Sequence, residues 1–304
     1  MREPADTLAG SGDYSHIAYR VRAGVAHVRL NRPDKLNALG FGPEGSRAEI
    51  LAALQCADAD PYVGSILVSA EGKAFCAGGD LTGAPPTDTP YEASEMVAEV
   101  DRFHAGIRAV RKPLVAAVHG LCLGAGMGML AQFDLVVAAA DARFGLVEGR
   151  IGHPGATELV AVIGPAWAKF LILTGELIDA RVAERIGLVL AVVAPEDLPA
   201  RAADLATRIA ATSSEATILN KAAIDAAADA LGRVDARIAG RTRDIVTVAH
   251  ARYATAPDGR LFADILATEG VAGIKAARDS QFTGRWLPDP TSSKETDDHR
   301  RHPG

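Results

Sequence analysis

The residues between His119 and Asp134 concentrate glycine just ahead of an apolar run. This stretch reads HGLCLGAGMGMLAQFD and holds glycine at positions 120, 124, 126 and 128. Each glycine inside a helix costs roughly 1 kcal/mol relative to alanine, so we expect these glycines to provide something in return. The candidates are a phosphate cradle, a tight packing contact, or a backbone amide directed at a ligand.

Three common glycine motifs do not fit this stretch. A dinucleotide-binding G-x-G-x-x-G needs glycine where Met129 stands, and neither a P-loop nor a G-x-S-x-G nucleophile elbow is present. What remains is a helix start, where the first amides have no intrahelical partner and lie at the positive end of the helix dipole. A second amide donor could come from AFCAGGD, Ala74 to Asp80. Two such donors converging on one carbonyl oxygen form an oxyanion hole, in which losing one donor typically costs about 2.7–4 kcal/mol in the transition state.

Alternating strands and helices are expected to position these segments. Apolar and β-branched runs predict strands at residues 16–21, 25–30, 64–70, 113–118, 134–140 and 187–193. Helical periodicity covers 43–60, 91–112 and almost all of 196–277, whereas 71–90 and 142–158 lack regular patterning. This order predicts an α/β core followed by a helical C-terminal part.

Composition excludes several other classes. The 304 residues carry a formal net charge of −6, which argues against a general nucleic-acid binder. The three cysteines at 56, 76 and 122 form no disulfide framework or metal-ligand pattern, so we expect a reducing, cytoplasmic location and no metal. We also expect no secretory signal, no apolar run long and charge-free enough to cross a membrane, and mobile tails at residues 1–13 and 285–304.

Six segments in register resemble the enoyl-CoA hydratase/isomerase (crotonase) family, over about His16 to Gly284. They are LNRPDKLNAL (30–39), KAFCAGGDL (73–81), KPLVAAVHGLCLGAG (112–126), ARFGLVEGRIGHPG (142–155), LTGELIDARVAERIGLVLAVV (173–193) and KAARDSQFTGR (275–285). The resemblance implies a crotonase-type spiral of ββα units over residues 14–200 and a helical trimerisation region over 201–284. It also implies an acyl-CoA substrate with no tightly bound cofactor, and a homotrimer or dimer of trimers with neither nucleic-acid nor membrane partners.

The same resemblance assigns catalytic roles to three residues. It places the two oxyanion-hole amides at Ala77 and Ala125, and it matches the second of the family's two glutamates to Glu148. The first glutamate falls on Gly128, which can neither hold a proton nor orient water. A single carboxylate suits double-bond isomerisation, or hydration with an unusual partner. Hydrolysis of a CoA thioester or β-diketone, and non-catalytic acyl-CoA binding, remain open, as does pairing of Glu148 with Arg150.

Further site residues follow from the matched motifs. His153 is a candidate substitute acid or base unless it is a surface residue, and His119 is an auxiliary candidate that could instead brace the turn. Gly128 is expected to leave room for a bulkier or branched acyl group, unless a neighbour such as Met127 or Met129 fills it. Asp80 is expected to support its loop. The residues expected to bind the coenzyme A part of the substrate are Arg32, Lys35, Ala74, Ala77, Gly78, Asp80, Leu81, Gly124 and Arg278.

Overall fold

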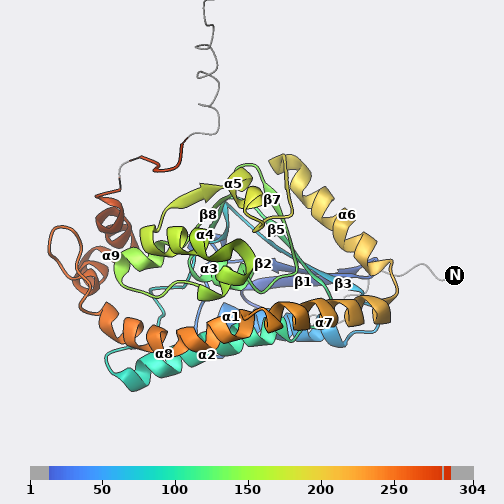
Figure 1. The fold of residues 1–304 in the computed structure, drawn as a ribbon, viewed down its shortest axis with the longest axis horizontal. Helices are drawn as coiled ribbons and strands as arrows, with labels where there is room; N and C mark the ends of the chain where they lie inside the picture. The colour runs from blue at the N-terminus through green and yellow to red at the C-terminus, as the bar shows by residue number, and fades with distance from the viewer. Residues whose placement is uncertain (1–13, 283, 289–304) are drawn as a thin grey trace, which may run out of the picture.

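A six-stranded sheet forms the centre of the molecule in the computed structural model, which describes residues 14–282 and 284–288 (Figure 1). Its strands lie in the order β1 (Ile17–Arg22), β2 (Val25–Leu30), β3 (Ser65–Ala70), β5 (Leu114–Val118), β7 (Leu135–Ala139) and β10 (Ala191–Val193). β1 and β2 pair in antiparallel fashion and the remaining pairs are parallel. Ala23 and Gly24 have φ values of 50° and 76°, as a two-residue hairpin turn between β1 and β2 requires.

The central strands β3 and β5 are apolar because helices cover both faces of the sheet. Alternate residues such as Ile66 and Leu114 face α1 (Ser46–Ala59) and α2 (Pro90–Arg108). Their neighbours Leu67 and Val115 face α6 (Leu198–Ala210). The domain boundary predicted between residues 200 and 201 therefore lies inside α6, a helix that packs on the sheet.

A second, smaller sheet carries the site and was not predicted from the sequence. Its strands are β4 (Ala74–Cys76), β6 (Leu121–Leu123), β8 (Arg143–Gly145) and β9 (Leu177–Asp179). β4, β6 and β8 run parallel, so their carboxyl ends meet at one edge of the sheet. The segments that follow these three strands come together at that edge. They are residues 77–80, α3 (Ala125–Leu130) and the short 3-10 helix η2 (Val147–Ile151).

The C-terminal helices enclose this edge from outside. α7 (Ser214–Ala230) leads into α8 (Arg233–Ala251), which lies along α2 (Figure 1). α9 (Phe262–Asp279) packs against η2. The helical pattern predicted for residues 196–277 is confirmed. The predicted tail at 1–13 lies outside the described residues, as does the part 289–304 of the tail predicted at 285–304, whereas Arg285 is described and donates to Asp179 Oδ2 at 2.9 Å.

One helical stretch, Thr157–Thr174, is long and apolar enough to cross a membrane by length and composition. The expectation concerned a run that is both long and charge-free, and this stretch contains Glu158 and Lys169. The stretch joins η3 (Thr157–Leu159) to α4 (Val160–Thr174), and Gly164 interrupts it with φ 73° and ψ 165°. Short helix α5 (Ala180–Arg185) follows after β9. Because Leu171 packs in the main core, part of this apolar surface belongs to the folded domain.

Candidate active site

The loop after β4 does not offer the amide that the sequence suggested. The N–H of Ala77 donates to the Leu36 carbonyl oxygen at 3.0 Å, so it is already used within the fold. The assignment of Ala77 as an oxyanion donor is therefore wrong. Leu39 forms a parallel bridge with Gly79, bonding through Gly78 O and Asp80 N on either side of it. In such a bridge the central residue directs its own N–H away from its partner strand.

The start of α3 supplies the other amide. Gly124 caps the helix with φ 51° and ψ −120°, and its carbonyl accepts from the amides of Met127 and Gly128. The amide of Ala125 stands in the first turn, where no intrahelical acceptor exists. An ideal Cβ on Gly78 would lie 3.9 Å from Ala125 N, so the two loops are in contact. Gly79 and Ala125 both line the same cavity.

Glu148 of η2 projects into this cavity beside the start of α3. Its Oε2 is buried and has no hydrogen-bond partner among the described residues, and it lies 2.9 Å from the point where a Cβ would stand on Gly124. Burial raises the pKa of Glu148 to about 7, against smaller lowering effects from a backbone hydrogen bond and the Arg278 charge. Arg150 instead pairs with Glu176 and Asp279, so the alternative of a Glu148–Arg150 ion pair is wrong.

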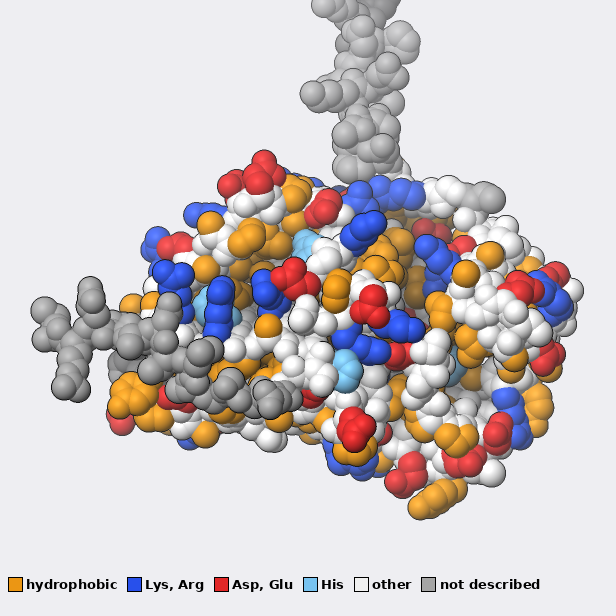
Figure 2. Space-filling view, turned by 180° about the vertical axis from the view of Figure 1, so that it is seen from behind, with side chains coloured by type: hydrophobic (Ala, Val, Ile, Leu, Met, Phe, Trp, Pro, Cys, Tyr) orange, Lys and Arg blue, Asp and Glu red, His pale blue; other side chains and the backbone are white. Residues whose placement is uncertain are grey.

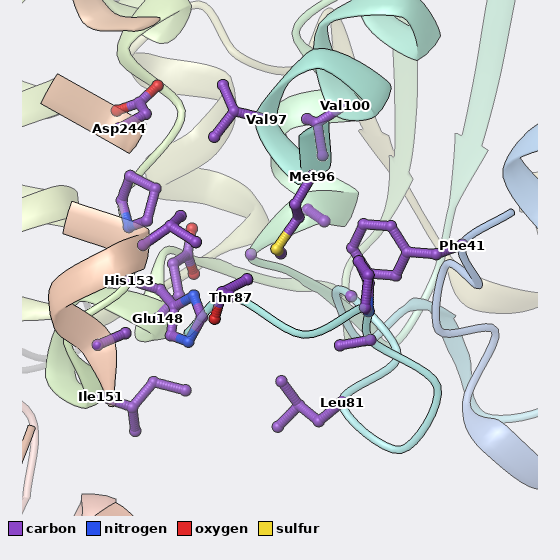
Figure 3. Close-up of a pocket in the computed structure, with 18 of the residues that line it drawn as sticks. Phe41, Leu81, Thr87, Met96, Val97, Val100, Glu148, Ile151, His153 and Asp244 are labelled. Atoms are coloured by element: carbon purple, nitrogen blue, oxygen red, sulfur yellow. The ribbon is translucent and has the colours of Figure 1, made fainter. Parts of the chain in front are cut away.

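The two auxiliary histidines occupy different places. His153 lines the cavity near Glu148 (Figure 3), and burial lowers its pKa. Its backbone amide donates to the Glu148 carbonyl oxygen at 3.0 Å, which fixes the two residues relative to each other. His119 Nε2 donates to the carbonyl of Gly72 at 2.9 Å and is not among the residues lining the two cavities described here. This bond fits the bracing role for His119.

The cavity around Glu148 has a volume of about 480 Å³ and an apolar wall. Figure 3 shows Met96, Val97 and Val100 of α2 on this wall, across the cavity from Glu148 and His153. Asp244 of α8 lies at its edge; burial, with the nearby charges of Glu158 and Asp101, raises the pKa of Asp244 to about 6. An apolar cavity with a few polar groups matches the usual form of a small-molecule site.

The space beside Gly128 is occupied. An ideal Cβ on Gly128 would lie 3.0 Å from Cε1 and 3.2 Å from Nε2 of His104. Met127 and Met129 are buried in the core instead. The expectation that Gly128 leaves room for a bulkier acyl group is therefore wrong, because the imidazole of His104 takes that room.

A second cavity, of about 720 Å³, adjoins the first and is lined by more basic side chains than the first. The two cavities share Gly79, Asp80, Leu81, Ile151 and Ile274 along their linings. The basic side chains around the second cavity are those of Lys35, Arg143, Arg150, Lys275, Arg278 and Arg285. Figure 2 shows Lys and Arg intermixed with Asp and Glu on one face of the molecule, with no continuous basic field.

The predicted coenzyme-binding residues divide into two groups. Six of them line one or both cavities, and these are Lys35, Ala77, Asp80, Leu81, Gly124 and Arg278. Arg32 is turned to structural use, donating to Asp80 Oδ2 at 3.0 Å and to Ala38 O at 2.8 Å. Asp80 also accepts from Thr82, and these bonds outweigh burial to lower the pKa of Asp80. Ala74 is fully buried in β4, and Gly78 contacts α3 instead of either cavity.

Comparison with known proteins decides the family. A family model described as enoyl-CoA hydratase/isomerase matches residues 20–250. The chain belongs to this family.

Relatives and solved structures agree with this membership. The chain is 32% identical over 280 residues to a "Probable enoyl-CoA hydratase" of Rhizobium meliloti (strain 1021), covering 90% of this chain and 99% of the relative. It is 40% identical over 208 residues to "Probable enoyl-CoA hydratase echA8" of Mycobacterium leprae (strain TN), covering 66% and 77% of the two chains. The fold matches the crystal structure of an enoyl-CoA hydratase/isomerase from Xanthobacter autotrophicus Py2 with a TM-score of 0.80 and 30% identity, covering 89% and 100%.

Sequence reasoning missed two side chains that shape the site of this family member. His104 lies on α2, which was predicted only as a helix, and no motif marks it. Arg47 of α1 is buried, donates to Leu39 O at 2.6 Å and has its charged group 4.0 Å from the Phe41 ring centre. Burial lowers the pKa of Arg47 to about 10. A basic residue within an apolar helical face was the available signal for Arg47.

Proposed function

We propose that this protein binds an enoyl-CoA and moves protons on its acyl chain, isomerising or hydrating the double bond. Glu148 carries the proton, and the backbone amides of Gly79 and Ala125 hold the thioester oxygen. The observation that carries the proposal is Glu148 Oε2, which is buried beside the first turn of α3 with no hydrogen-bond partner in the part of the chain that the structure describes. A carboxyl with a pKa of about 7 exchanges a proton readily at neutral pH.

The two cavities correspond to the two parts of such a substrate. The apolar first cavity suits the acyl chain, and the second suits the coenzyme A arm because Lys35 and Arg278 line it. Basic side chains pair with phosphate groups through charge-assisted hydrogen bonds. The proposed chemistry needs no tightly bound cofactor, since coenzyme A arrives as part of the substrate.

Isomerisation needs only the groups named so far. The Glu148 carboxylate removes a proton from C2 of a 3-enoyl thioester, and the electron pair moves to the thioester oxygen between the two amides. The resulting dienolate takes the same proton back at C4, leaving the double bond between C2 and C3. Oxyanion stabilisation of this kind contributes about 2.7–4 kcal/mol per donor in typical enzymes.

Turnover of defined substrates tests the proposal. The wild-type protein and Glu148→Gln are incubated with 2-enoyl-CoA and 3-enoyl-CoA, and products are followed by chromatography with free coenzyme A measured in parallel. We expect isomerisation or hydration by the wild type and a loss of about 10²–10⁴-fold in the variant. Release of coenzyme A as the main product would assign hydrolysis instead, and binding without turnover would assign a non-catalytic binder.

We also propose that the chain assembles as a homotrimer or a dimer of trimers. The supporting observation is the apolar surface on the C-terminal helices, where Leu219 is 69%, Ile224 69% and Leu231 88% exposed. Exposed apolar groups clustered on such helices commonly mark protein–protein contacts. Sedimentation velocity measures the assembly, and a monomer at micromolar concentration would contradict it.

A further inference from the structure

The imidazole of His104 lines the first cavity, the one around Glu148, and contacts Gly128. Gly128 N donates to Gly124 O at 3.1 Å, so the two glycines lie one turn apart along the start of α3. Glu148 Oε2 is placed at the first of them and the Nε2–Cε1 edge of His104 at the second. Two groups able to transfer protons therefore flank the same helical turn, and both line the cavity.

A hydrogen-bonded network fixes the orientation of His104. Its Nδ1 lies 3.1 Å from Oε1 of Glu158 in η3, and both side chains are about nine-tenths buried. Gln132 Nε2 donates to the same Glu158 oxygen at 3.2 Å and to Gly128 O at 3.0 Å. A carboxylate that accepts from Nδ1 leaves Nε2 as the nitrogen available for proton transfer.

We infer that His104 is a second catalytic residue, which activates water for addition to the acyl chain, and that Glu158 positions the imidazole of His104. This inference rests on the proposed enoyl-CoA function. The neutral His104 Nε2 accepts a proton as the water oxygen bonds to C3 of a 2-enoyl thioester. Glu148, in its protonated form, gives its proton to C2, so the electron pair of the double bond becomes the new C–H bond. The step leaves imidazolium and carboxylate, and solvent returns the proton from His104 to Glu148.

The positions of the two groups match this division of labour. The thioester oxygen is held at the Ala125 amide, and Glu148 Oε2 lies next to the adjoining Gly124, which places it near C2. The imidazole of His104 on α2 contacts Gly128, one turn further along α3, and in the proposed binding mode C3 and the rest of the acyl chain extend toward it. The negative charge of Glu158 stabilises the imidazolium as it forms, because a close opposite charge in a buried site is strongly felt.

A comparison of two reactions tests the inference. Hydration of a 2-enoyl-CoA requires both groups, whereas exchange of C2 hydrogens of a saturated acyl-CoA with D2O requires only Glu148 and the amides. We expect His104→Gln, which retains a donor toward Glu158, to lower hydration kcat about 10²–10³-fold. Exchange, followed by mass spectrometry, should stay within about threefold of wild type. Glu158→Gln should lower hydration about 10–100-fold, as removal of an orienting partner does.

A swap of side chains gives a second, independent measurement. Gly128→Glu alone should lose hydration because its Cβ would press on the imidazole. His104→Ala should also lose it, and the double variant His104→Ala/Gly128→Glu should regain at least about tenfold over His104→Ala, since a carboxylate then occupies the vacated space.

The outcomes separate the inference from the function on which it rests. Hydration and exchange that fall together in His104→Gln, or hydration that stays unchanged, overturn the role of His104 while the function stands. Exchange without hydration by the wild type has the same effect. A wild type that performs neither reaction overturns both. Thermal unfolding of each variant reports whether it is folded. If the His104 variants do not fold, Glu158→Gln still tests the inference, because it retains the imidazole.

Discussion

Glu148 Oε2 lies 2.9 Å from the position that a Cβ would take on Gly124. The backbone at Gly124 has φ 51° and ψ −120°, a conformation that side chains strongly disfavour. Glycine is thus required at position 124 for two reasons: the backbone conformation disfavours a side chain, and the Glu148 carboxyl lies where a Cβ would stand. This relationship explains why the chain accepts glycine at the start of a helix.

Replacing Gly124 should therefore damage activity more than stability. For Gly124→Ala we expect a loss of roughly 1–3 kcal/mol of unfolding free energy from backbone strain. We also expect kcat/KM to fall at least about 10²-fold, because Glu148 and the Ala125 amide are displaced together. Gly164→Ala is the matched control, since Gly164 has φ 73° with nothing within 4 Å of its Cβ position. Denaturant unfolding measures the stability of each variant and steady-state kinetics its kcat/KM. Equal kcat/KM in Gly124→Ala and Gly164→Ala would refute the steric argument.

The pKa of Glu148 gives opposite pH dependences for the two reactions. Isomerisation needs the carboxylate, so kcat/KM should rise with pH and level off above about pH 7. Hydration needs the protonated acid, so its kcat/KM should fall above about pH 7. Asp244 titrates near 6 in the same cavity and burial lowers the pKa of His153, so Asp244→Asn and His153→Gln serve as controls. Parallel profiles for the two reactions would contradict the assignment.

Stability should show the same titration. The unfolded pKa of this glutamate is near the ordinary 4.5 and the folded value is about 7. Between these values the folded state binds more protons, so the free energy of unfolding falls as pH rises through this window. The full difference corresponds to about 3 kcal/mol. Glu148→Gln removes the titration, so the variant should gain stability relative to wild type as pH rises from 4.5 to 7. Urea unfolding measures this. A difference in unfolding free energy between the two proteins that stays constant over this range would show that the pKa of Glu148 is not shifted.

The large elements could be predicted because their patterns are long. The apolar run of β3 and the periodicity of α1 and α2 each extend over enough residues to show the faces that are buried. The small sheet escaped prediction because β4, β6, β8 and β9 have three residues each. Alternation needs about four residues to be visible, so strands of three residues give no such pattern.

The sequence predicted which segments form the site, but not which of their atoms face the cavity. The matched motif located the loop after β4, but only the Leu36–Ala77 hydrogen bond shows that the Ala77 amide is engaged. Glu148 was predicted from the matched motif and lines the cavity, whereas the absence of a hydrogen-bond partner for Oε2 among the described residues depends on tertiary burial. His104 could not be found because it is 24 positions before Gly128 and meets it only through packing of α2 on α3.

The role of the Gly79 amide can be tested separately from the effect of adding a side chain at this position. A Cβ on Gly79 would meet only Arg47 Nη2, at 3.7 Å, so Gly79→Ala should fold and retain activity within about threefold. Gly79→Pro removes the amide hydrogen and should lower kcat about 10²–10³-fold. Kinetics on 3-enoyl-CoA with thermal unfolding as a folding check measure this. Full activity in a folded Gly79→Pro variant would exclude the Gly79 amide as a donor.

The basic residues of the second cavity should affect binding of the nucleotide part and not the chemistry. Arg278 is paired with Asp279 at 2.7 and 2.8 Å but lines the cavity together with Lys35. We expect Lys35→Ala and Arg278→Ala each to raise KM for enoyl-CoA about tenfold at low salt with kcat nearly unchanged. The same variants should leave KM for the corresponding enoyl-pantetheine unaltered, because that substrate lacks the nucleotide phosphates. Arg208→Ala, an exposed ion-pair residue of α6, is the control. An equal rise in KM for both substrates would place the phosphates elsewhere, because a phosphate contact discriminates between the two substrates whereas a general distortion of the cavity does not.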